Sequence, residues 1–161
     1  MRFQEQGTGF DDAAPTGRLA QLLAYWQRLN PGGLPLRRDI DLVRMNPAIL
    51  PHVFIVDVLD GGQRFRWRFI GAHIVRHAGT DDTGLDLDIS VTPSMRATII
   101  GHYQQVARGR QPLCPRGDFV GRDRRTYRYE RLLLPVLADD GAYVDTVLGG
   151  AVFAAEAHAS P

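Results

Sequence analysis

Lysine is absent from the 161 residues, and all 19 basic side chains are arginine. Without lysine, the chain has no amine for Schiff-base chemistry and no lysine for a phosphate-binding loop. Charge of one sign is not in excess either, because 18 acidic residues leave a net charge of +1. Such a balance does not attract nucleic acid or an anionic membrane over the whole surface. We therefore expect neither a nucleic-acid partner nor a membrane partner.

Cysteine occurs once, at Cys114, which excludes an intramolecular disulfide and a cysteine-based zinc cluster. The first 17 residues contain no apolar core of signal-peptide length. No run in the chain approaches the roughly 18 apolar residues that a membrane span requires. Together these features predict a cytoplasmic protein.

The length and the composition, with 44% hydrophobic and 23% charged residues, are typical of one globular domain. Residues 1–17 are polar and have no period, which predicts a disordered tail. Residues 18–155 contain no repeat and no linker. We expect them to form a single domain that is followed by a tail at 156–161.

A helix is predicted after a cap at Thr16 or Gly17, because apolar side chains recur there at a helical period. The sequence NPGG at residues 30–33 ends this helix. Its apolar stripe is too wide and aromatic to face water, so it packs either on its own domain or on a second copy of the chain. We predict a homodimer whose interface is this stripe, formed by Leu19, Leu22, Leu23 and Trp26.

A β-hairpin is predicted from a β-rich run at 52–59, the turn DGG at 60–62 and a second run at 63–70. The second run alternates aromatic residues with arginines, so one face belongs to the core and the other meets water or a polar partner. This separation argues against binding of single-stranded nucleic acid, which needs both kinds of side chain on one surface. The two sets are Phe65, Trp67 and Phe69 on the core face and Arg64, Arg66 and Arg68 on the other.

Three helices are predicted in the middle of the chain: 72–78, which ends at Gly79, a short one within 85–90, and a long one at 93–109. The last third is rich in β-forming residues, and the turn DDG at 139–141 joins its final two strands. This order predicts an α+β fold with a five-stranded antiparallel sheet. The middle helices cover one face, and the N-terminal helix is free to cover the other.

The element order resembles a PAS domain, and the residues resemble a bacterial single-domain PAS-like sensor family. The stretch at 50–84 resembles the first hairpin and following helix of that family, and 129–153 resembles its last hairpin. The lead-in "YWQRL…IDLVRMNPAILPH" is also similar. The resemblance covers roughly residues 19–153. In the first stretch it rests on Leu50, Pro51, Gly71, Ile74, Gly79, Asp82, Thr83 and Gly84, and in the last on the run Glu-Arg-Leu-Leu-Leu-Pro at 130–135.

The resemblance implies a non-catalytic sensory or regulatory module. A small ligand or a partner would bind between the sheet and the middle helices and shift the outer surface of the sheet. We expect the signal to leave through a protein partner, because the chain contains no kinase, cyclase or DNA-binding segment. Matching of fold elements implies a pocket lined by Phe65, Trp67, Phe69, Ile74, Met95, Ile99, His102, Tyr103, Phe119, Leu132, Leu134 and Leu148. The alternative is that these residues fill a solid core and bind no ligand.

Histidines raise the question of a metal. His73 and His77 are four residues apart, a spacing used by helical zinc sites. Ile74 stands where the usual glutamate would be, and both histidine positions vary in the family that the chain resembles, so we expect no metal. In haem-binding PAS domains the iron ligand is a histidine on the long helix, which leaves haem open at His102 although we expect no cofactor. Cys114 lies outside the motif of flavin-binding photosensors and reads as a structural thiol.

An enzyme is the alternative class. A cone-shaped α+β isomerase or hydratase has a similar length and uses one aspartate or histidine as a base in a deep apolar pocket. Asp57 or Asp145, buried and facing a large cavity beside His102, would support this alternative. The early hairpin and the mid-chain helices favour the PAS order instead.

Overall fold

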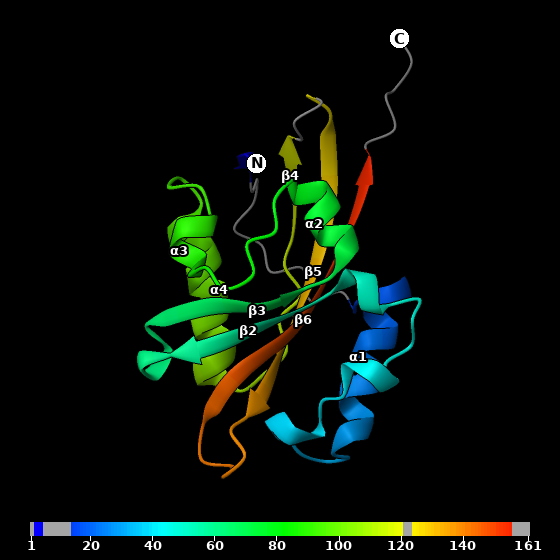
Figure 1. The fold of residues 1–161 in the computed structure, drawn as a ribbon, viewed down its shortest axis with the longest axis vertical. Helices are drawn as coiled ribbons and strands as arrows, with labels where there is room; N and C mark the ends of the chain where they lie inside the picture. The colour runs from blue at the N-terminus through cyan, green and yellow to red at the C-terminus, as the bar shows by residue number, and fades with distance from the viewer. Residues whose placement is uncertain (1, 5–13, 121–123, 156–161) are drawn as a thin grey trace.

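The computed structural model describes the backbone of residues 2–4, 14–120 and 124–155, and the side chains of residues 14–118 and 124–154. Within these residues, six antiparallel strands form one sheet in the order β1-β4-β5-β6-β2-β3 (Figure 1). The strands are β1 (Arg2–Gln4), β2 (Val53–Leu59), β3 (Arg64–Ile70), β4 (Arg116–Val120), β5 (Thr126–Leu137) and β6 (Val144–Ala155). The five-stranded antiparallel sheet that the sequence predicts is confirmed, with β1 added at its edge.

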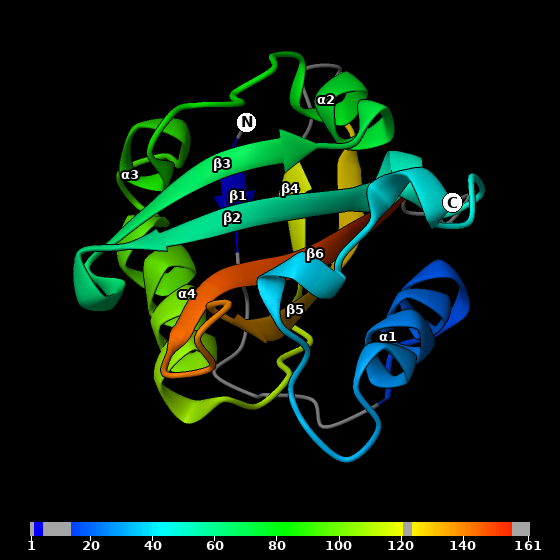
Figure 2. The same cartoon turned by 60° about the horizontal axis from the view of Figure 1, so that its bottom comes forward.

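Helices lie on both faces of this sheet. Figure 2 shows α1 on one side and α3 and α4 on the other. Short 3-10 turns precede β2 and close the first hairpin. Among the described residues, none of the helices has the length and apolar character needed to cross a membrane. The helices are α1 (Gly17–Leu29), α2 (Ala72–Ala78), α3 (Leu87–Ser90) and α4 (Arg96–Gly109), and the 3-10 turns are Arg37–Asp39, Leu42–Arg44, Leu50–His52 and Asp60–Gly62.

The sheet separates the core into two clusters of buried side chains. We call the first the α1 face; its members are Leu19, Leu22, Trp26, Met45, Ile49, Val53, Ile55, Leu132, Leu134, Val136 and Leu148. We call the second the α4 face; its members are Phe54, Val56, Phe65, Leu87, Val91, Met95, Ile99, Tyr103, Val106, Leu133, Val147 and Ala151. Each strand in the middle of the sheet thus buries both of its sides.

The predicted homodimer interface is wrong, because the stripe of α1 packs on the sheet of its own chain. Leu19 and Leu22 are each 1% exposed, and Trp26 is 8% exposed. The indole Nε1 of Trp26 donates a 2.9 Å hydrogen bond to the Pro135 carbonyl of β5. Leu23 packs against the same cluster. Leu19, Leu22 and Trp26 are therefore covered within their own chain, Leu23 is partly buried, and a homodimer stays a prediction.

A β-bulge in the first hairpin corrects the predicted alternation of β3. Ile55 pairs with Phe69 and Val56 pairs with Trp67, so Arg68 is an extra residue on β3. The extra residue reverses the side on which the following side chains lie. Trp67 packs on the α4 face, whereas Phe69 packs on the α1 face. The prediction that Phe69 shares a face with the other two aromatic residues is therefore wrong.

The predicted disordered tail is contradicted at residues 2–4, which form β1 and pair with β4. Residues 5–13, and the tail predicted at 156–161, lie outside the described residues. The predicted N-terminal helix is confirmed as α1, which starts at Gly17.

Candidate functional site

A cavity of about 190 Å³ lies on the α4 face, between the sheet and helices α2, α3 and α4. Strands β2, β3, β5 and β6 form its floor, and the three helices together with the segment from α2 to α3 form its walls. Most of its lining is apolar. The residues that line it are Phe54, Trp67, Ile70, Ile74, Ala78, Thr80, Asp82, Ser90, Val91, Ile99, Tyr103, Tyr129, Arg131, Ala151 and Phe153.

Aromatic rings form one wall of the cavity. Phe54 and Trp67 meet edge to face, with ring centroids 5.4 Å apart, and Phe54 lies 6.4 Å from Tyr103. The backbone of β6 allows this packing because residue 149 is glycine. A Cβ at Gly149 would lie 2.2 Å from two atoms of the Phe54 ring. The absence of a side chain at residue 149 thus leaves room for the Phe54 ring against the neighbouring strand.

A chain of hydrogen bonds closes a second side of the cavity. The indole Nε1 of Trp67 donates to the Ser90 hydroxyl at 3.1 Å, and that hydroxyl donates to Asp82. The other carboxylate oxygen of Asp82 accepts a bond from the Thr80 hydroxyl at 3.1 Å. These polar groups therefore satisfy one another.

At Arg131 and Tyr103, by contrast, polar groups of the cavity residues lack hydrogen-bond partners. The Arg131 Nε and the Tyr103 hydroxyl are both buried and have no hydrogen-bond partner. Arg131 does place one terminal nitrogen 2.9 Å from Nδ1 of His102, and its guanidinium lies 5.7 Å from the centre of the Tyr129 ring. Because arginine can only donate, the His102 Nδ1 is the acceptor. This corner of the cavity holds a positive charge and two donors that are not used.

Tyr103 is fully buried, and desolvation raises the pKa of its phenol to about 12, although the charge of Arg131 acts in the opposite direction. The guanidinium lies close enough to the hydroxyl to lower this pKa by its charge and by a hydrogen-bonding contribution, although no hydrogen bond of ordinary geometry joins the two groups. At neutral pH the hydroxyl is therefore protonated and can act as a hydrogen-bond donor.

Four of the predicted pocket residues line this cavity: Trp67, Ile74, Ile99 and Tyr103. Three predicted residues point the other way. The placement of Leu132, Leu134 and Leu148 in the pocket is wrong, because all three side chains belong to the α1 face. On β5 the odd-numbered residues face the cavity, and the two leucines are even-numbered. Binding of a ligand by the four lining residues stays a prediction.

The remaining predicted residues lie near the cavity without lining it. Phe65 and Met95 are buried in the α4 face behind the cavity wall, and Phe69 is on the opposite face. The side chain of Phe119 lies outside the described residues. His102 is half-buried at the edge of α4 and is bound to Arg131.

These features do not fit a haem. His102 is absent from the cavity lining, and its Nδ1 is already used by Arg131. A volume of about 190 Å³ is also below the roughly 300–1,000 Å³ of pockets for drug-sized ligands, and haem is larger than those. The cavity is therefore too small for a haem.

Several cavity residues were not predicted, among them Phe54, Tyr129, Arg131 and Ala151. Arg131 ends an arginine-rich run at 122–131, which is typical of a solvent-facing surface, so the residue gave no signal of its own. The available signal was the pairing register. Gly149 lies opposite Leu133, which places Tyr129 and Arg131 on the side where Phe54 packs.

The two histidines of α2 join a third histidine. The rings of His52 and His73 are 4.2 Å apart, those of His73 and His77 are 4.7 Å apart, and His77 stacks on Phe153 at 4.6 Å. Burial, with His52 and His77 nearby, lowers the pKa of His73 to about 4. Burial also lowers the pKa of His52. In the described part of the chain, no group of three or more histidine, cysteine or acidic side chains is arranged to hold a metal ion.

Cys114 lies before β4 and packs against the α1 face, away from the cavity. Its thiol is 3.6 Å from a carboxylate oxygen of Glu130. Burial raises the pKa of this thiol to about 12, and the negative charge of Glu130 acts in the same direction. A thiol in such surroundings is not a nucleophile at neutral pH.

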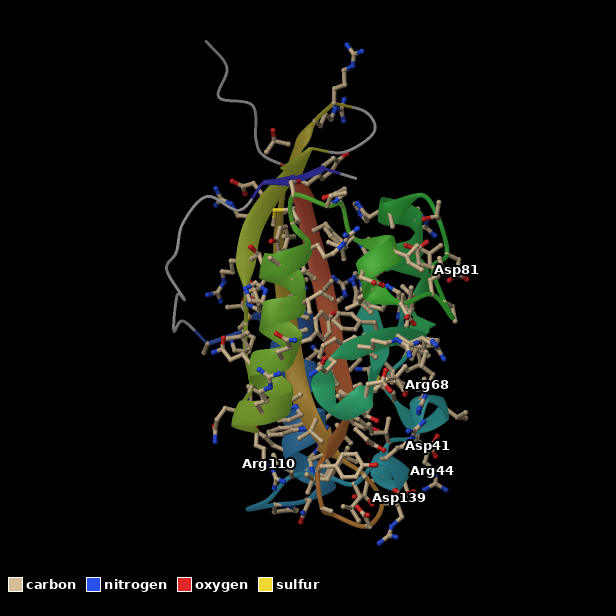
Figure 3. The ribbon with its side chains drawn as sticks, turned by 90° about the vertical axis from the view of Figure 1, so that its left-hand side faces the viewer. Asp41, Arg44, Arg68, Asp81, Arg110 and Asp139 are labelled. Atoms are coloured by element: carbon tan, nitrogen blue, oxygen red, sulfur yellow. The ribbon has the colours of Figure 1, made fainter. Side chains whose placement is uncertain are left out.

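The two aspartates singled out as possible bases also lie away from the cavity. Arg37 bridges them, with 3.5 Å to Asp57 and 3.3 Å to Asp145, and Arg68 forms a second ion pair with Asp57. Figure 3 shows Arg68 on the side of the molecule turned away from α4. Burial raises the pKa of Asp57, and the charge of Arg37 opposes this shift. The arrangement is an ion-pair network at the end of the sheet.

Comparison with known proteins identifies a family that has this architecture. Residues 16–151 match the sequence profile of the PAS domain family. A fungal LOV domain photoreceptor is similar in structure, with a TM-score of 0.51 and 12% identity, over 82% of this chain and 89% of that one. An RNA-binding light-oxygen-voltage receptor aligns with a TM-score of 0.45 and 17% identity, over 74% of this chain and 37% of that one. Comparison with curated proteins gives no match.

Proposed function

The chain belongs to the PAS domain family, and from that premise we propose that it is a non-catalytic sensory module that binds a small molecule in the cavity of the α4 face. The observation that carries this proposal is the cavity itself. A well-packed interior has few voids larger than a water molecule, whereas this one has about 190 Å³. At ~30 Å³ per molecule, that is room for about six waters.

The absence of catalysis in this proposal is supported by where the carboxylates lie. Asp57 and Asp145 are at the end of the other face, and each is paired with arginine. Asp82 does line the cavity, but its two oxygens accept hydrogen bonds from Ser90 and Thr80. A general base must reach a proton of the substrate, and none of these three carboxylates has a free oxygen aimed at the centre of the cavity. We further propose that the module needs no haem or metal.

The signal would leave through a protein partner, by way of α3. Ser90 and Val91, at the end of this helix, line the cavity, and the adjacent Ile89 is 70% exposed. Leu85, just before the helix, is 42% exposed. A ligand that moves the inner side of so short a helix would also move these apolar side chains. The sheet itself is covered by α1, so α3 offers a more direct route than the sheet's outer face.

Cytoplasmic location also stays a proposal, consistent with a single unpaired cysteine.

A thermal unfolding experiment with toluene tests the proposal. Toluene is apolar and small, so its binding reports the space in the cavity and not its charge. A ligand that binds only the folded state raises the midpoint temperature by mass action. We expect millimolar toluene to raise the Tm of the wild-type chain by a few degrees.

The matched control is Ala151→Leu, which extends a side chain that is 3% exposed into the cavity. This variant should fold and should show no toluene-dependent shift. An unchanged Tm of the wild-type chain at saturating toluene, or an equal shift in both chains, contradicts the proposal.

A further inference from the structure

The polar groups of the cavity are unevenly satisfied. On the side of α3, the groups of Trp67, Ser90, Asp82 and Thr80 bond to one another. At the junction of β5 and α4, the Arg131 Nε and the Tyr103 hydroxyl are buried with no partner. A buried donor without a partner costs roughly 1–3 kcal/mol. A folded chain that keeps two of them in one cavity is prepared for an acceptor that comes from outside.

The charge at this corner is also uncompensated. Among the described residues, no carboxylate oxygen lies within ion-pair distance of Arg131. Its guanidinium contacts the acceptor nitrogen of His102 and the ring of Tyr129. Asp82 lines the same cavity but is engaged with Ser90 and Thr80. The missing partner of the guanidinium is therefore an anion.

The volume limits the size of that anion. An engineered cavity of about 150 Å³ with apolar walls holds one benzene. The present cavity of about 190 Å³ has space for a benzene-sized body and one small head group. Its walls are the rings of Phe54 and Trp67 and the aliphatic side chains of Ile74 and Ile99. These walls match an apolar body, while the Arg131 corner matches a planar carboxylate that can accept two hydrogen bonds.

We propose that the cavity binds a small monocarboxylate with an aromatic or branched apolar body, and that Arg131 and Tyr103 hold its carboxylate. The Arg131 Nε and the Tyr103 hydroxyl donate to the two carboxylate oxygens. The apolar body lies against Phe54, Trp67 and Ile99. This inference rests on the proposed function, since it names the ligand class of the same cavity.

Isothermal titration calorimetry with two probes of nearly equal shape tests the inference. Benzoate carries the negative charge, and benzamide is its neutral counterpart. We expect benzoate to bind the wild-type chain at least tenfold more tightly than benzamide at pH 7. The preference should shrink at high salt less than a surface interaction would, because the site is buried.

Three variants assign the preference to residues. Arg131→Gln should abolish the preference for benzoate over benzamide, and Tyr103→Phe should weaken benzoate about fivefold without affecting benzamide as strongly. Arg44→Gln is the matched control, because it removes one positive charge from a side chain that is 88% exposed. It should leave both affinities unchanged. Circular dichroism checks that each variant is folded. If Arg131→Gln does not fold, the ratio of benzoate to benzamide affinity in the wild-type chain decides the case alone.

The outcomes separate this inference from the proposed function. Equal binding of benzoate and benzamide, or a benzoate preference that survives Arg131→Gln, overturns the carboxylate assignment while the cavity still accepts small molecules. Failure of benzoate, benzamide and toluene together overturns both. If Arg44→Gln also abolishes tight benzoate binding, the anion binds at the surface, and this result contradicts the inference.

Discussion

The two faces of the sheet are built from the same strands but differ in how completely they are filled. On the α1 face, Leu132, Leu134 and Leu148 are at most 1% exposed, and the one indole N–H of Trp26 has its partner at 2.9 Å. On the α4 face there is a cavity of about 190 Å³, and two donors at its edge have no partner. The difference teaches that one face is closely filled, whereas the other keeps space and unpaired polar groups at the place where we propose that a ligand binds.

The largest difference between the faces should appear when an aliphatic side chain is truncated. Leu22→Ala on the α1 face opens a void in close packing and should lower the free energy of unfolding by about 3–4 kcal/mol. Ile74→Ala, at the cavity, should lower it by only about 1 kcal/mol, because its half-buried side chain already faces empty space. Urea unfolding followed by far-UV circular dichroism measures both values. Equal losses would show that the two faces are packed alike.

A second comparison concerns buried polar groups. Trp26→Phe removes a paired donor, leaves the Pro135 carbonyl without its bond and should cost about 2 kcal/mol. Tyr103→Phe removes a hydroxyl that has no partner, so the free energy of unfolding should stay the same or rise by up to about 1 kcal/mol. The same urea experiment distinguishes them. A loss of 2 kcal/mol or more in Tyr103→Phe would mean that its hydroxyl is satisfied in the free protein.

The smallest effect is expected at α2, where His73 adds a dependence on pH. Its pKa is lowered to about 4 in the folded chain, below the ordinary value of roughly 6.5. Above pH 6.5 both states are neutral. Between pH 6.5 and about 4 the unfolded chain takes up a proton that the folded chain does not, so stability falls as the pH falls.

With allowance for partial solvent exposure, this loss should be about 1 kcal/mol. His73→Gln should show a flatter profile, and its difference from the wild-type chain should change only inside this pH range. The wild-type and variant profiles serve as each other's control, because other groups titrate in both. Parallel profiles from pH 7 to pH 4 would contradict the lowered pKa of His73.

Much of the fold could be predicted because the local signals agree with the tertiary structure. The apolar period of residues 17–29, the turns at 60–62 and 139–141 and the helix end at Gly79 all use short-range chemistry. Gly79 takes a φ of 80° as the cap of α2, a conformation in which glycine has no steric cost. The resemblance of residues 19–153 to PAS-like sensors then joined these elements in the right order.

The site was harder to predict, because periodicity indicates which side chains of a strand share a face but not which helices pack on that face. Both sides of β5 are buried, so the leucines at 132 and 134 were as plausible in the pocket as Tyr129 and Arg131. The bulge at Arg68 places Phe69 on the other face, and the residue types in β3 do not predict such a bulge. The unpaired state of Arg131 depends on three-dimensional neighbours that the sequence does not show.

The position of a bound probe tests the difference between the faces most directly. Intermolecular nuclear Overhauser effects between benzoate and methyl-labelled protein report which side chains contact the ring. We predict effects from the benzoate protons to the methyl groups of Ile74 and Ile99, and none to those of Leu22 and Leu132. Effects to the leucines, or effects to none of these methyl groups at saturating benzoate, would contradict the assignment of the ligand to the α4 face.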